Sequence, residues 1–198
     1  MDMTSLITTL LSSDSVSGVG KAANADKGNV QSVLNAALPL LLNGAKAQSE
    51  DKSTAESFAN ALLSHGQKDT SNVASFLKNV DLDDGAKIIG HLLGNGDSVK
   101  TIAKESGVSS KETSNILSAA APLLMSLLGQ GTSSKKNNNT AAALSIASAV
   151  LQNVDVGDLL GNLLGGSPKK KTAAASKKDD DNDTAAEVIG DILGKLLK

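Results

Sequence analysis

A long stretch of the chain recurs 83 residues further on, and this repeat limits the folds that the chain can adopt. Asp14–Val16 recurs as Asp97–Val99, and Val33–Leu41 aligns with Ile116–Leu124 without a gap. Both copies of the longer segment contain an Ala-Ala pair and a proline at matching positions. An ungapped match of this kind predicts two supersecondary units of the same type that pack against each other.

A shorter motif, apolar-apolar-Gly-polar-apolar-apolar-Gly, occurs three times, as Ile88–Gly94, Leu159–Gly165 and Val188–Gly194. Low-complexity charged sequence separates the third copy from the second, and such sequence buries too little apolar surface to order itself. We therefore expect four parts: a helical unit at 1–87, a second unit at 88–166 that shares one core with the first, a flexible charged linker at 167–183 and a C-terminal amphipathic helix at 184–198.

Apolar residues recur with the spacing of a helix rather than that of a strand. Phe58, Ala59 and Leu62 fall on one helical face, and no segment alternates for long enough to indicate a strand. Two segments, Ser53–Glu56 and Ser109–Glu112, have the capping-box pattern that begins a helix. The sequence therefore predicts an all-α fold of two tandem pseudo-equivalent helical units.

Each unit also contains a pattern typical of a helix-turn-helix. In the second unit, Ala103 is small enough for close helix contact, Gly107 tolerates a positive φ in the turn, and Ser109 caps the next helix. The first unit has Gly20, Asn24 and Asp26 at the equivalent positions. A DNA-reading motif would expose the start of each second helix, where the candidate contacts are Lys27, Ser110, Lys111 and Asn115.

The composition disfavours nucleic acid as the partner. The chain carries 19 Lys and Arg against 21 Asp and Glu, and every cation is a lysine. Arginine makes the commonest specific contact with guanine, and neutralisation of phosphates supplies most non-specific affinity. We therefore interpret the repeated pattern as a packing unit, with a weak nucleic-acid binder as the first alternative.

No catalytic or cofactor-binding constellation is evident. The chain has no cysteine, which excludes a thiolate nucleophile and a thiolate metal site. His91 stands where the other motif copies have Asn162 and Asp191, which indicates an exposed polar position. His65 is expected in a loop, without a partner near it in sequence. We expect a protein that is not an enzyme and holds no cofactor or metal. Carboxylates just before apolar helices are interpreted as helix caps or favourable partners of the helix dipole: Asp81, Asp83, Asp84, Asp155 and Asp158.

The expected C-terminal helix needs a surface on which to dock, because about four turns are marginally stable alone in water. Its apolar face is a candidate docking face formed by Ile189, Ile192, Leu193, Leu196 and Leu197. A protein partner or self-association is expected. A peripheral membrane surface is the second alternative and ranks below a protein partner, because the polar face is not basic enough to favour anionic lipid strongly. No secretion signal or transmembrane segment is evident, which predicts a cytoplasmic protein.

Two segments carry a resemblance to a known family. These are Asp84–Gly94, with its glycine-rich apolar helix, and Ile102–Gly129, which includes Ala121-Pro122-Leu123-Leu124. Over about residues 3–165 the chain resembles the YidB-like bacterial family, a domain of unknown function. The resemblance implies an all-helical, homeodomain-like fold and brings no catalytic residues. The function expected from the whole sequence is that of a non-enzymatic helical interaction or assembly module.

Overall fold

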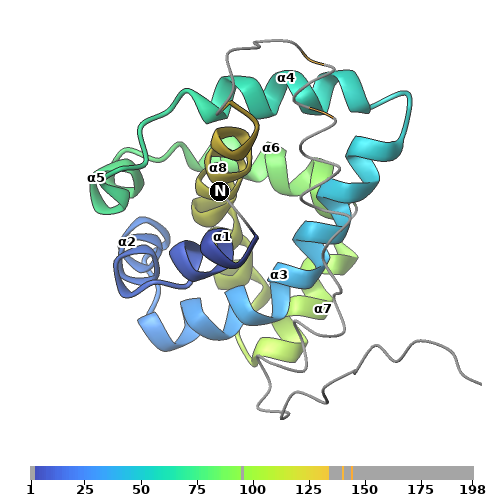
Figure 1. Ribbon diagram of the computed structural model, residues 1–198. Helices are drawn as coiled ribbons and strands as arrows, with labels where there is room; N and C mark the ends of the chain where they lie inside the picture. Colours follow the sequence, from blue (N-terminus) through green and yellow to red (C-terminus); the bar gives the residue numbers. More distant parts are fainter. Residues whose placement is uncertain (1–2, 95, 134–139, 141–143, 145–198) are drawn as a thin grey trace, which may run out of the picture. The chain divides into compact units, whose positions relative to one another are not determined.

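The computed structural model describes residues 3–94, 96–133, 140 and 144. The chain divides into two units, residues 1–167 and 168–198, and the described residues belong to the first. The expected all-α fold is confirmed for this part, which contains helices and no strand (Figure 1). In chain order the helices are α1 (Met3–Leu10), α2 (Ser13–Ala23), α3 (Lys27–Glu50), α4 (Ala55–Gly66), α5 (Val73–Lys78), α6 (Leu82–Leu93), α7 (Asp97–Ser106) and α8 (Ser110–Ser133).

Helix α8 is the centre of the fold. It contacts each of the seven other described helices, which surround it (Figure 1). Its apolar residues from Ile116 to Leu128 are all buried, because this stretch has hydrophobic or small residues on every side of the helix. Leu34 in α3 and Leu117 in α8, which are aligned in the 83-residue repeat, are both completely buried.

Helices α3 and α8 have the same length, an internal proline at the same position and a similar preceding turn. Each has 24 residues and contains one internal proline, Pro39 or Pro122. The helix before each one ends in a left-handed residue, Asn24 with φ 53° or Gly107 with φ 71°. The turn pattern predicted this conformation, which glycine and asparagine adopt more readily than other residues.

Glycines allow α4 and α6 to approach α8 closely. Pro122 has no N–H, so the carbonyl of Ser118 one turn earlier lacks its helical donor. That carbonyl faces Gly85 of α6, where a β-carbon would overlap the Ser118 oxygen. At the other end of α8, a β-carbon at Gly129 would likewise overlap the Leu62 carbonyl oxygen and the Gly66 backbone of α4. The backbones of α4 and α6 therefore lie against the central helix.

Three helix ends differ from what the sequence predicts. The division expected after residue 87 falls inside α6, so a boundary there would cut a helix. The capping box expected at Ser53 is wrong: Thr54 is the N-cap, and the Ser53 backbone N–H and hydroxyl donate to Asp51 Oδ1 at 2.8 and 2.6 Å. Asp26 is the N-cap of α3, but its side chain makes no capping hydrogen bond.

The remaining parts of the predicted organisation lie outside the described residues. These are the linker at 167–183, the C-terminal helix at 184–198 and most of the second unit after Ser133. Within the described part, no helix is long and apolar enough to cross a lipid bilayer.

Candidate functional site

The residues predicted as nucleic-acid contacts lie at the starts of α3 and α8. Lys27 begins α3, Ser110 and Lys111 begin α8, and Asn115 follows one turn later; all four are exposed. The two helix starts are joined, because Asn29 Nδ2 donates a hydrogen bond of 2.9 Å to Glu112 Oε1. Asn29 and Glu112 occupy equivalent positions of the 83-residue repeat. The structure therefore brings the two predicted sites together on one surface.

This juxtaposition does not suit two separate DNA half-sites. Recognition helices of a paired helix-turn-helix protein enter major grooves about 34 Å apart, and one groove admits one helix. Here the first turns of the two helices are within hydrogen-bond distance of each other. A polar hollow of about 390 Å³ lies beside them, and its charged lining is balanced: Lys21, Lys27, Asp26 and Glu112. Nucleic-acid binding at these residues remains a prediction, which this geometry disfavours.

An apolar groove lies on another part of the surface, between α4 and α6. We call it the α4–α6 groove. Its floor is Phe58 and Ala61 from α4, Ile88 and Leu92 from α6, and Met125 from the central helix; its rim is Gln48, Ser53, Thr54, Ser57 and His91. It encloses about 260 Å³. An apolar floor with a few polar groups around it is typical of a binding site.

The polar rim is held in place by hydrogen bonds. Gln48 Nε2 donates to the carbonyl oxygen of His91 at 2.9 Å, which joins the end of α3 to the end of α6. Thr54 Oγ1 donates to the Gln48 carbonyl at 3.1 Å. The Ser53 hydroxyl donates to Asp51, and this hydrogen bond keeps the pKa of the Asp51 carboxyl below its usual value. One end of the groove therefore has a fixed polar edge.

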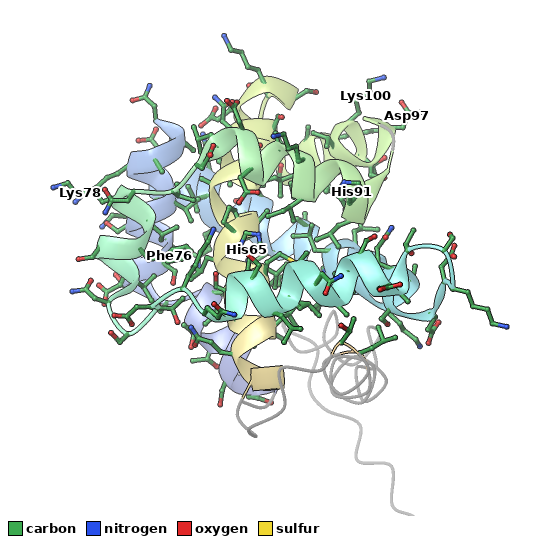
Figure 2. The ribbon with its side chains drawn as sticks, turned by 90° about the horizontal axis from the view of Figure 1, so that it is seen from above. His65, Phe76, Lys78, His91, Asp97 and Lys100 are labelled. Carbon is green, nitrogen blue, oxygen red and sulfur yellow. The ribbon has the colours of Figure 1, made fainter. Side chains whose placement is uncertain are left out.

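His91 is exposed on α6, as the comparison of the three motif copies predicted. Figure 2 shows it on α6, away from His65. His91 lies on the rim of the groove, where an imidazole can exchange hydrogen bonds with a ligand. No local sequence pattern identifies this position, because the groove is formed by helices far apart in the chain.

The expectation that His65 lies in a loop is wrong. His65 lies in the last turn of α4 rather than in a loop, and it is buried. Its Nε2 is 3.6 Å from Asp84 Oδ2 in α6, and Lys68 Nζ is 3.7 Å from the same oxygen. Burial lowers the pKa of His65, Lys68 lowers it further and Asp84 raises it. A sequence signal for the burial exists, since His65 continues the helical stripe of Phe58 and Leu62.

The capping interpretation of the carboxylates is confirmed for Asp81. Its Oδ1 accepts hydrogen bonds from the backbone N–H groups of Asp83 and Asp84, at 2.9 and 3.2 Å, at the start of α6. Asp155, Asp158 and the candidate docking face of Ile189, Ile192, Leu193, Leu196 and Leu197 lie outside the described residues.

Comparison with known proteins identifies the family of the chain. No curated protein and no solved structure matches it. One family model matches residues 5–131, a range that covers the eight described helices almost completely. Its description is "Bacterial protein of unknown function (DUF937)". The chain therefore belongs to DUF937, a family of bacterial proteins of unknown function.

Proposed function

We propose that the protein is a non-enzymatic interaction module that binds an amphipathic helix of a protein partner in the α4–α6 groove. The observation that carries this proposal is the apolar floor between two helices, with polar groups confined to the rim. A helix that docks in such a groove inserts side chains from positions i, i+3, i+4 and i+7. A volume of about 260 Å³ suits a few such side chains rather than a large cofactor.

The chemistry of the floor supports a helical ligand. Met125 at the bottom is unbranched and polarisable, so it adapts to side chains of different shapes. Phe58 and Leu92 are buried and anchored in the core, so the walls need little ordering when a ligand binds. A preformed site loses less conformational entropy on binding than one that must first become ordered.

We further propose that α2–α3 and α7–α8 are pseudo-equivalent, homeodomain-like units that serve as the scaffold for this groove. Three observations support the pairing: the equal lengths of α3 and α8, the left-handed residues Asn24 and Gly107, and the bond between Asn29 and Glu112. In this proposal the helix-turn-helix-like pattern organises the core and does not read DNA.

The test is the affinity of a fluorescent helical peptide, measured by anisotropy. The probe has leucines at i, i+3, i+4 and i+7, and a peptide of the same composition in scrambled order is its control. We expect saturable binding of the first peptide, reduced at least tenfold by Ala61→Glu, because a carboxylate would then enter the apolar groove.

A matched variant controls for added charge. Ala74 is exposed on α5, a helix that does not line the groove, so Ala74→Glu should bind the peptide like the unmodified protein. Equal affinity for the ordered and scrambled peptides, or no effect of Ala61→Glu, would refute the proposed function.

A further inference from the structure

We propose that His65 and Asp84 form an acid-sensitive latch between α4 and α6, and that a proton on His65 Nδ1 opens it. The latch would regulate the α4–α6 groove, so its consequence for ligands rests on the function proposed above. The opening itself is a property of the chain alone.

The latch and the groove involve different parts of the same two helices. The groove is lined by α4 from Ser57 to Ala61 and by α6 from Ile88 to Leu92. His65 lies in the last turn of α4 and Asp84 in the first turn of α6, so the two helices run antiparallel. Figure 2 shows His65 and His91 well apart along this pair. A contact at one end of the two helices therefore helps to set their spacing at the other.

The burial and the surroundings of the His65 ring make the latch sensitive to protonation. Its side chain is 9% exposed, its Nε2 points towards Asp84 at 3.6 Å, and its Nδ1 has no hydrogen-bond partner among the described residues. In the neutral ring, a proton on Nε2 faces the carboxylate and Nδ1 keeps only a lone pair. Protonation adds a buried N–H on Nδ1 that has no acceptor, which is more costly than an unpaired lone pair on a neutral ring.

The charges around His65 do not offset this cost. Asp84 is partly exposed and is shared with Lys68, whose ammonium repels an imidazolium. Helix α8, against which α4 packs, has no ionisable side chain between Thr113 and Ser133. Consistent with this arrangement, burial and Lys68 lower the pKa of His65 below 6.5 despite Asp84.

The direction of the pH dependence follows from the different proton affinities of the open and closed forms of the latch. The open form exposes His65 and binds a proton with the ordinary affinity of the ring, whereas the closed form binds it more weakly. Closure is therefore fully favoured above pH 6.5 and is lost progressively as the pH falls towards the lowered pKa of the closed form. One proton changes the opening equilibrium by at most tenfold per pH unit.

The test is amide hydrogen exchange of the full chain at pH 7.5 and 5.5, corrected for intrinsic exchange rates. We expect the last turn of α4 and the first turn of α6 to lose protection at pH 5.5, by up to tenfold per pH unit below 6.5. His65→Gln should abolish this change, and His91→Gln, which alters an exposed histidine of α6, should keep it. Unchanged protection in the unmodified protein, or the same loss in His65→Gln, would overturn the latch.

A second variant guards against poor folding of His65→Gln. Lys68 is half-exposed, and Lys68→Gln removes the repulsion while leaving the ring in place, so it should reduce the loss of protection at pH 5.5. The same or a larger loss would contradict the proposal.

Affinity for the leucine-bearing peptide, measured at both pH values, then separates the two proposals. Weaker binding at pH 5.5 in step with the exchange supports regulation of the groove, and equal binding overturns it. No binding at either pH overturns the proposed function and leaves the latch to be judged by exchange.

Discussion

At the scale of single residues, Thr113 shows where the repeat is imperfect. It is completely buried in the first turns of α8, and its hydroxyl has no partner among the described residues. The equivalent residue of α3 is Val30, which is also completely buried. A buried hydroxyl without a partner destabilises the fold. We therefore expect Thr113→Val to raise the free energy of unfolding by about 1 kcal/mol, measured by urea denaturation; a decrease would mean that the hydroxyl is satisfied.

His65 shows which side chains the sequence can place. Its helical stripe with Phe58 and Leu62 predicts burial, because all three positions face the same side of α4. The proximity of Asp84 has no such signal, since the two residues belong to different helices and meet only when both pack on α8. Local periodicity indicates which residues are inside, whereas tertiary packing decides which of them meet.

At the scale of the helix, α6 provides a matched pair of glycines. A β-carbon at Gly85 would overlap the Ser118 carbonyl, whereas one at Gly90 would meet nothing within 4 Å. Gly85→Ala should therefore lower the free energy of unfolding by about 1–3 kcal/mol or more, because α6 must move away from α8. Gly90→Ala should raise it by about 0.5–1 kcal/mol through helix propensity. Thermal unfolding of both variants is the measurement, and equal effects would contradict the described contact of α6 with α8.

The contact between the starts of α3 and α8 is testable in the same way. The hydrogen bond from Asn29 to Glu112 joins two helices that begin 83 residues apart. A double-mutant cycle with Asn29→Ala and Glu112→Ala should give a coupling energy of about 0.5–1.5 kcal/mol. Additive effects of the two substitutions would show that the helix starts do not stabilise each other.

At the scale of the whole molecule, the two predicted DNA-contact surfaces form one surface with balanced charge. We therefore expect no retardation of duplex DNA in gel shifts, even at low salt, where phosphate contacts are strongest. Lys27→Glu combined with Lys111→Glu should change neither thermal stability nor affinity for the helical peptide. Retardation that this double variant abolishes would support the nucleic-acid alternative instead.

Much of the architecture could be predicted from the chain, and most of the candidate site could not. Helical periodicity indicated an all-α fold, and the turn pattern indicated the left-handed Asn24 and Gly107. The α4–α6 groove has lining residues from Gln48 to Met125, drawn from four helices and the turn before α4. No local pattern encodes such a site, because it exists only after α4 and α6 have packed on the central helix.

The most direct test of the central claim uses the methionine methyl groups. The chain has three methionines, Met1, Met3 and Met125, and Met125 lies on the floor of the groove. Methyl NMR of the full chain, labelled with ¹³C at methionine, therefore provides a reporter on the floor of the groove. We predict that the leucine-bearing helical peptide shifts the Met125 signal, that the scrambled peptide does not, and that Ala61→Glu suppresses the shift. A bound peptide that leaves the Met125 signal unchanged would show that it binds elsewhere, and would contradict the account.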